Sequence, residues 1–122
     1  MQNKRRLGAV HEKRVAEYFR QQGYRILEQN FRCHFGEIDL IAQKDGYIVF
    51  VEVKYRSSDS FGTPMAAVER KKQRRISNTA SYYLYSRHWP TDTACRFDVA
   101  AVSDQSIQII ENAFYYAGNF GR

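Results

Sequence analysis

The sequence is poor in the residues that stabilise secreted or zinc-dependent small proteins. Cys33 and Cys95 are its 2 cysteines, too few for a disulfide framework, so we expect free thiols in a reducing cytoplasm. The dipeptide Cys33-His34, with His11 and His88 elsewhere, lacks the spacing of zinc ligands. The sequence therefore predicts neither a disulfide-stabilised fold nor a zinc site.

Long apolar segments are also missing. The first residues, MQNKRRLGAVHEKR, contain no apolar core or cleavage site of a signal peptide, and no apolar run approaches the length of a membrane span. No internal repeat, linker or low-complexity segment is present. With 122 residues, we expect a cytoplasmic protein without a membrane partner, formed by one domain over residues 1–113 and an aromatic, glycine-rich tail over residues 114–122.

What the sequence does have is positive charge. Its 19 Lys and Arg residues exceed its 13 Asp and Glu residues, which gives a formal net charge of +6. Such a balance favours a polyanionic partner, and nucleic acid is favoured over a membrane because no lipidation or anchoring motif is present. Many small basic proteins bind no nucleic acid, so charge alone does not assign the partner.

Hydrophobic periodicity predicts helices and strands in the order α-β-β-β-α-β-β. The second helix is expected to start at Thr63-Pro64, because threonine caps helices and proline suits the first turn. A helix between the third and fourth strands implies a crossover, so these strands should be parallel in a mixed sheet. The expected ranges are 4–22, 24–32, the two arms of a hairpin in 35–56, 64–86, 96–102 and 106–111.

The central hairpin, FGEIDLIAQKDGYIVFVEVKYR, turns at Asp45-Gly46, the strongest short hairpin signal. A two-residue loop fixes the register by counting outward from the turn, and alternation then assigns each side chain to a face. Four charged residues, Glu37, Asp39, Glu52 and Lys54, fall on one face. The opposed pairs are Lys44 with Tyr47, Asp39 with Glu52 and Glu37 with Lys54, while Ile38 and Leu40 share the other face.

Asp39 and Glu52 are the pair that needs an explanation, because opposed carboxylates repel each other without a counter-charge. A divalent cation would supply that charge. Two carboxylates and the backbone carbonyl of Val53 are hard oxygen ligands that suit Mg²⁺ or Mn²⁺ and leave room for substrate phosphates. Lys54 would then hold or deprotonate an attacking water, or neutralise charge developing at phosphorus.

Two charged residues interrupt the apolar stripes of the helices. Glu12 falls on the inward face of the first helix, where it could complete a metal site, or lie at the edge and reach solvent or an arginine. Lys72 falls midway between Val68 and Ile76 in the stripe of the second helix. Its ammonium either extends outward along an apolar surface or lies beside the hairpin carboxylates or a bound phosphate.

These residues carry a resemblance to known proteins. Asp39 followed by Glu52-Val53-Lys54, after a helix with Glu12, resembles the PD-(D/E)XK nuclease superfamily, whose core is α-β-β-β-α-β. The segments GEIDLIA, FVEVKYR, FGTP, AVERKKQRR and RFDVAAV together look like the YraN family of uncharacterised bacterial proteins, which resemble archaeal Holliday-junction resolvases in fold. The resemblance runs from about Gly8 to Phe114 and implies a restriction-endonuclease-like α/β fold.

The resemblance also implies roles for single residues. It implies that Lys54 is the catalytic lysine, acting with Asp39 and Glu52. Glu37 and Asp98 could also be taken for ligands. We interpret Glu37 as the cross-strand neighbour of Lys54, and Asp98 as structural. The implied metal ligands are Asp39, Glu52, the Val53 carbonyl and Glu12, and the residues assigned to nucleic-acid or phosphate binding are Lys72, Gln73, Arg56 and Arg75.

The sequence therefore predicts a metal-dependent nucleic-acid phosphodiesterase, an endonuclease acting on DNA with Mg²⁺ or Mn²⁺. Branched DNA is suggested only by analogy with the resolvases. A chain this short would need to form a homodimer to cut two strands symmetrically, and the aromatic tail offers one contact surface. The alternative is a non-catalytic nucleic-acid binding module of the same fold, in which the basic face carries affinity and the acidic residues are structural.

Overall fold

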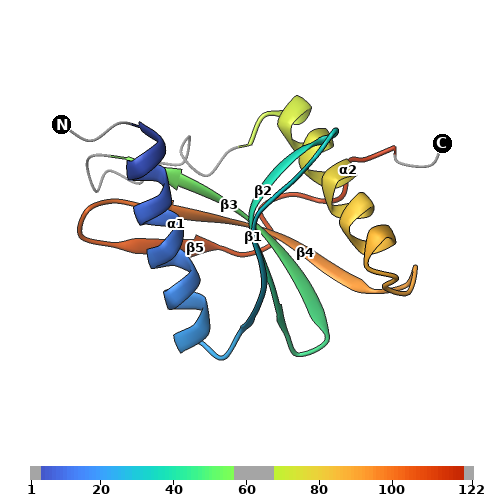
Figure 1. Ribbon diagram of the computed structural model, residues 1–122, viewed down its shortest axis with the longest axis horizontal. Coiled ribbons are helices and arrows are strands. Elements are labelled where there is room, and N and C mark those ends of the chain that lie inside the picture. Colours follow the sequence, from blue (N-terminus) through green and yellow to red (C-terminus); the bar gives the residue numbers. More distant parts are fainter. Residues whose placement is uncertain (1–3, 57–67, 120–122) are drawn as a thin grey trace.

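The computed structural model describes residues 4–56 and 68–119 of the chain. Its helices and strands follow the predicted order (Figure 1), and the mixed α/β fold with an α-β-β-β-α-β core expected of restriction-endonuclease-like proteins is confirmed. The elements are α1 (Lys4–Gln21), β1 (Arg25–Cys33), β2 (Gly36–Lys44), β3 (Tyr47–Tyr55), α2 (Arg70–Ser86), β4 (Ala94–Val102) and β5 (Ile107–Ile110).

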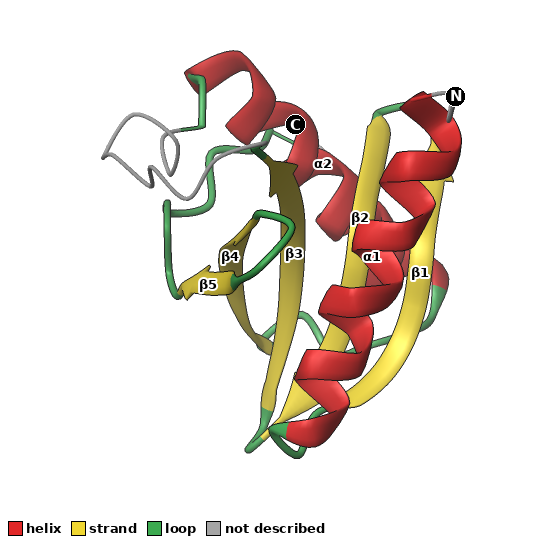
Figure 2. Cartoon of the chain, turned by 90° about the vertical axis from the view of Figure 1, so that its left-hand side faces the viewer, coloured by secondary structure: helices red, strands yellow, loops and turns green. Residues whose placement is uncertain are grey.

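One five-stranded sheet, in the order β1-β2-β3-β4-β5, forms the centre of the molecule. Strands β3 and β4 are parallel, as predicted from the helix between them, and the other neighbours are antiparallel. Figure 2 shows α1 across one face of the sheet, with α2 behind it. No helix within residues 4–56 and 68–119 is long and apolar enough to cross a bilayer.

Each helix covers its own hydrophobic core. On the α1 face, Val15, Ala16 and Phe19 pack against alternate residues of β2, β3 and β4. On the α2 face, Ile76, Ala80 and Tyr83 pack against the intervening residues of the same strands. Burial of aliphatic and aromatic side chains on both faces is the main favourable contribution to folding. The strand residues are Leu40, Ala42, Val49, Val51, Ala100 and Val102 on the α1 face, and Ile38, Ile41, Ile48, Phe50, Phe97 and Val99 on the α2 face.

The hairpin turn is as predicted, but the ladder beyond it is shorter. Asp45 and Gly46 have φ angles of 53° and 82°, which a type I′ turn requires. The pairing of β2 with β3 runs from Lys44–Tyr47 to Leu40–Val51. The predicted opposition of Asp39 to Glu52 and of Glu37 to Lys54 is therefore not part of the ladder. Strand β2 leaves β3 at this level and stays paired with β1.

The departure of β2 from β3 corrects two further predictions. Glu37 is the partner of Arg32 in β1, with 2.7 Å between Arg32 Nε and Glu37 Oε2, so its interpretation as the neighbour of Lys54 was wrong. Ile38 and Leu40 were expected on one face, yet Ile38 packs on the α2 side and Leu40 on the α1 side. Strict alternation fails here because it assumes a regular strand through Asp39.

Helix α2 starts later than predicted. Glu69 has an extended backbone, with φ −58° and ψ 145°, and its carbonyl accepts the first helical hydrogen bond from the Gln73 amide at 2.9 Å. The Gln73 side chain donates to the carbonyl of Val68 at 2.8 Å and so fixes the approach to the helix. Val68 and Glu69 are not helical, and the expected start at Thr63-Pro64 lies outside the described residues.

The tail packs onto α2 over its described part. Phe114 is 8% exposed and belongs to the α2-side core. The amide of Ala117 donates to Ser77 Oγ at 3.0 Å, and Asn119 and Asn78 are joined by two hydrogen bonds of 2.8 and 2.9 Å. These contacts give the buried polar side chains of Ser77 and Asn78 their hydrogen-bond partners.

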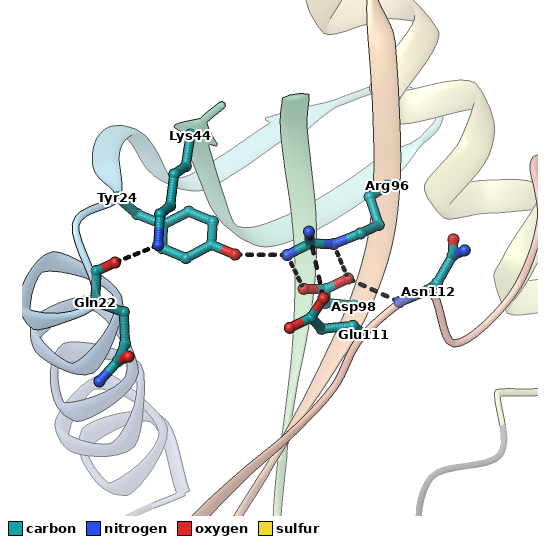
Figure 3. Close-up of polar contacts among 7 residues, drawn as sticks. All are labelled: Gln22, Tyr24, Lys44, Arg96, Asp98, Glu111 and Asn112. Carbon is teal, nitrogen blue, oxygen red and sulfur yellow. Dashed lines mark hydrogen bonds and ion pairs between the residues drawn. The ribbon is translucent and has the colours of Figure 1, made fainter. Parts of the chain in front are cut away.

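A buried ion pair lies near the start of β4 (Figure 3). Arg96 donates to both oxygens of Asp98, each at 2.9 Å, and to the hydroxyl of Tyr24 at 2.7 Å. Asp98 Oδ1 also accepts the Asn112 amide at 3.0 Å. The Asp98 side chain is fully buried, so Asp98 has the structural role that the sequence suggested.

Candidate functional site

A cavity of about 350 Å³ opens where β2 and β3 separate. Its walls come from α1, from the start of β2, from β3 beyond the last pair of the ladder, and from the first turns of α2. Most of its lining is polar or charged. The lining residues are Glu12, Gly36, Glu37, Asp39, Glu52, Val53, Lys72, Arg75 and Ile76.

Asp39 and Glu52 are in contact in this cavity, although they are not ladder partners. Asp39 Oδ2 accepts a hydrogen bond of 2.8 Å from the backbone amide of Val53. Burial first, and then the side chain and charge of Glu52, raise the pKa of Asp39 to about 8, while the bond from Val53 lowers it. The raised pKa favours the protonated form of Asp39 unless a cation takes the place of the proton.

Lys72 supplies a positive charge from α2. Its ammonium forms an ion pair with the buried Oε2 atom of Glu52. The Glu52 side chain is 10% exposed, whereas that of Lys72 is 52% exposed. Of the two predicted orientations, the structure has the one in which the ammonium lies beside the hairpin carboxylate. The Lys72 side chain nevertheless stays about half exposed.

A glycine brings α2 close to β2 at this point. Gly36 has φ 152°, a conformation that side chains disfavour, and a Cβ there would lie 3.3 Å from Thr79 Oγ1 and 3.7 Å from Arg75 Cβ. The close approach places Lys72 and Arg75 over the cavity. Neither Gly36 nor Ile76 was expected to line the site, and the glycine at the first position of the acidic strand β2 was the available signal.

Glu12 enters the cavity from α1, half-buried and beside Asp39. Burial raises the pKa of Glu12, and the side chain of Asn30 lowers it. Even so, no group of three or more His, Cys, Asp or Glu side chains in the described part of the chain is arranged to hold a metal ion.

Three of the predicted site residues do not line this cavity. Lys54 is half-buried next to it, and burial lowers the pKa of its ammonium, as do Lys72 and Arg56, against the effect of Glu52. The Gln73 side chain donates to the carbonyl of Val68, just before α2. Arg56 is exposed at the end of β3.

The raised pKa of Asp39 predicts a pH dependence of stability. The folded state binds a proton between the ordinary pKa of 3.8 and about 8, where the unfolded state has lost it, so the free energy of unfolding falls as pH rises through this window. Asp39→Asn removes the titration and keeps an acceptor for Val53. In metal-free buffer, the free energy of unfolding of the variant should equal that of the wild type at pH 4. At pH 8 it should be higher, on the order of a few kcal/mol. Urea unfolding across this range measures the difference, and Glu17→Gln, an exposed acid on α1, should leave the wild-type slope unchanged.

Comparison with known proteins places the chain in a family. Residues 11–102 match the model of the uncharacterised protein family UPF0102. The chain belongs to UPF0102. This confirms the YraN-family resemblance seen in the sequence.

Relatives in this family match along nearly their whole length. A UPF0102 protein of Lachnoclostridium phytofermentans is 49% identical over 92% of this chain and 95% of its own. Another, of Syntrophus aciditrophicus, is 48% identical over 96% of this chain and 93% of its own. The crystal structure of SSO0001 aligns with 87% of this chain and 49% of that chain, at a TM-score of 0.42 and 15% identity, which is too distant to support a statement on function.

Proposed function

We propose that this UPF0102 protein is a metal-dependent nucleic-acid phosphodiesterase. The observation that carries the proposal is the contact between Asp39 and Glu52 in a cavity that Lys72 and Arg75 also line. Acidic ligands for a cation and basic partners for a phosphate thus meet in one place, as phosphoryl-transfer sites require.

The donor set fits Mg²⁺ or Mn²⁺. These ions bind through one or two carboxylates and keep positions for water and substrate phosphate, so a pair of carboxylates with the Val53 carbonyl is sufficient. A cation would replace the proton that the raised pKa of Asp39 places on the pair. When bound, it would polarise a phosphoryl oxygen and lower the pKa of a water. Glu12 takes the role of an accessory acid that orients Asp39.

The remaining side chains handle water and phosphate. Lys54, with its lowered pKa, holds the attacking water or receives its proton. Lys72 and Arg75 bind the phosphate oxygens, and Gln73 and Arg56 contact the strand on either side. The basic surface continues along the exposed residues Arg70, Lys71 and Arg74 of α2, which suits the sequence-independent attraction of a nucleic-acid backbone.

The proposed substrate is DNA in the cytoplasm, and branched DNA is included only by analogy with the resolvases. Two symmetric cuts would need a homodimer. Tyr85, Tyr115 and Tyr116 are exposed near the end of α2 and in the tail. Large exposed aromatic side chains are enriched at protein interfaces, so this surface is the proposed dimer contact.

A substrate screen tests the proposal. We expect Mn²⁺ or Mg²⁺ to raise the melting temperature, because a ligand at a hundredfold excess over its Kd adds about 2.7 kcal/mol to the free energy of unfolding. We also expect cleavage of at least one junction, flap, single-stranded or duplex DNA, lost with EDTA. Cleavage that persists in Lys54→Ala would identify a contaminating nuclease instead.

One observation favours a second function, a nucleic-acid binding module without catalysis. The ion pair of Lys72 with Glu52 already supplies a counter-charge without a metal. Such a module would bind nucleic acid with a steep salt dependence and would show no response to Mn²⁺. Glu52→Gln would then leave its affinity for DNA unchanged or raise it.

A further inference from the structure

Asn30 lies in β1 at the level of Asp39 and has a left-handed backbone, with φ 55°. The Cα pairs on either side of it are Gln29–Leu40 and Phe31–Ile38. Residues with a Cβ rarely adopt positive φ, and asparagine is among the few that tolerate it. Regular β-strands exclude this conformation. The left-handed backbone of Asn30 therefore needs a structural or a functional explanation.

Side chains change face at this level in both strands. Gln29 lines a hollow together with α1 residues, whereas Phe31 packs edge-on against Tyr83 of α2, with ring centroids 5.1 Å apart. Leu40 and Ile38 likewise belong to the α1-side and α2-side cores. Residues two apart in a regular strand share a face. Both strands are therefore turned at Asn30 and Asp39.

The turn coincides with the end of the ladder between β2 and β3. Beyond Leu40–Val51, the partner of the Val53 amide is the carboxylate of Asp39, at 2.8 Å. The Asp39 side chain thus points at β3 and Glu52.

We propose that Asn30 is a positioning residue whose left-handed backbone turns β2 at Asp39 and so brings the Asp39 carboxylate onto the Val53 amide. Its use in holding a cation rests on the proposed function, while the geometry itself does not. The relevant property is the backbone conformation of Asn30, which glycine reproduces and alanine does not.

Amide hydrogen exchange of Val53 tests this geometry without a metal. In Asn30→Ala, we expect the Val53 amide to exchange roughly tenfold faster relative to the core amides, because its acceptor is displaced. Asn30→Gly should restore wild-type protection, and Asp39→Ala should match Asn30→Ala. Asn112→Ala is the matched control, since Asn112 is also exposed with φ 56°; it should leave Val53 protected.

Mn²⁺ binding by calorimetry gives the second readout. Affinity should fall about tenfold in Asn30→Ala and return in Asn30→Gly. Unchanged Val53 protection in Asn30→Ala would overturn the inference. Equal losses in Asn30→Gly and Asn30→Ala would also overturn it, and would assign the effect to the amide side chain beside Glu12. A wild type that binds no Mn²⁺ but shows the expected Val53 pattern would refute the metal site and support the positioning role.

Discussion

Glu52→Gln should abolish both the Mn²⁺-dependent gain in melting temperature and the cleavage of DNA. The substitution keeps the shape of the side chain and removes the charge that pairs with Lys72 and that the proposed cation would bind. Loss of a ligand carboxylate lowers activity by at least about a hundredfold. Titration of Mn²⁺ in a thermal-shift assay and a single-turnover cleavage assay measure the two effects.

Glu37→Gln is the matched control for this prediction. Glu37 lines the same cavity, but its partner is Arg32 in β1, so the Mn²⁺ response should persist. Lys54→Met should separate the two readouts, because the proposed role of this lysine is to act on water and not on the cation. The thermal shift should remain and cleavage should be lost. A full Mn²⁺ shift in Glu52→Gln would refute the carboxylate pair as the metal site.

Asp98→Ala should cause the largest loss of stability, about 3–5 kcal/mol. The substitution leaves the guanidinium of Arg96, whose side chain is 17% exposed, without its two hydrogen bonds to a carboxylate. It also removes the acceptor of the Asn112 amide. Because the Tyr24 hydroxyl also binds Arg96, the contact of the α1–β1 connection with β4 loosens as well. Urea unfolding at neutral pH measures the change.

Two comparisons make this stability prediction specific to the buried pair. Asp104→Ala removes an exposed aspartate that accepts a bond from Tyr55 and should cost under about 1 kcal/mol. Arg96→Met with Asp98→Leu replaces both charges by apolar groups and should recover much of the loss. If Asp98→Ala lowered the free energy of unfolding as little as Asp104→Ala, the ion pair at the start of β4 would not stabilise the fold.

The parts of the fold that depend on local chemistry were predictable from the sequence. Asp45-Gly46 fixes the hairpin turn by its need for positive φ, and the helix between β3 and β4 fixes their parallel pairing. Lys72 was also identifiable, because a charge within an apolar stripe must either extend outward or find a partner.

Features that depend on where regular structure stops were not predictable. Counting outward from the turn assumes that the ladder continues, and it ends at Leu40–Val51; the error in the partner of Glu37 follows from that. Similarly, a proline and a threonine suggested an early start for α2, but the backbone is still extended at Glu69. Nothing in the pattern of β1 indicated that Asn30 would turn two strands.

The packing of the tail on α2 has a consequence for the order in which the chain folds while it is being translated. The side chains of Ser77 and Asn78 accept hydrogen bonds from the backbone amides of Ala117 and Asn119. Strand β3 gains its parallel neighbour only once β4 has been made. A chain made from its N-terminus onward therefore exposes Asp39 and Glu52 on an incomplete sheet while the ribosome is still adding the segment that anchors α2. Lys72 takes its final place only after the segment through Asn119 has been made, so a product truncated before this segment would carry the acidic pair without a fully packed α2 beside it.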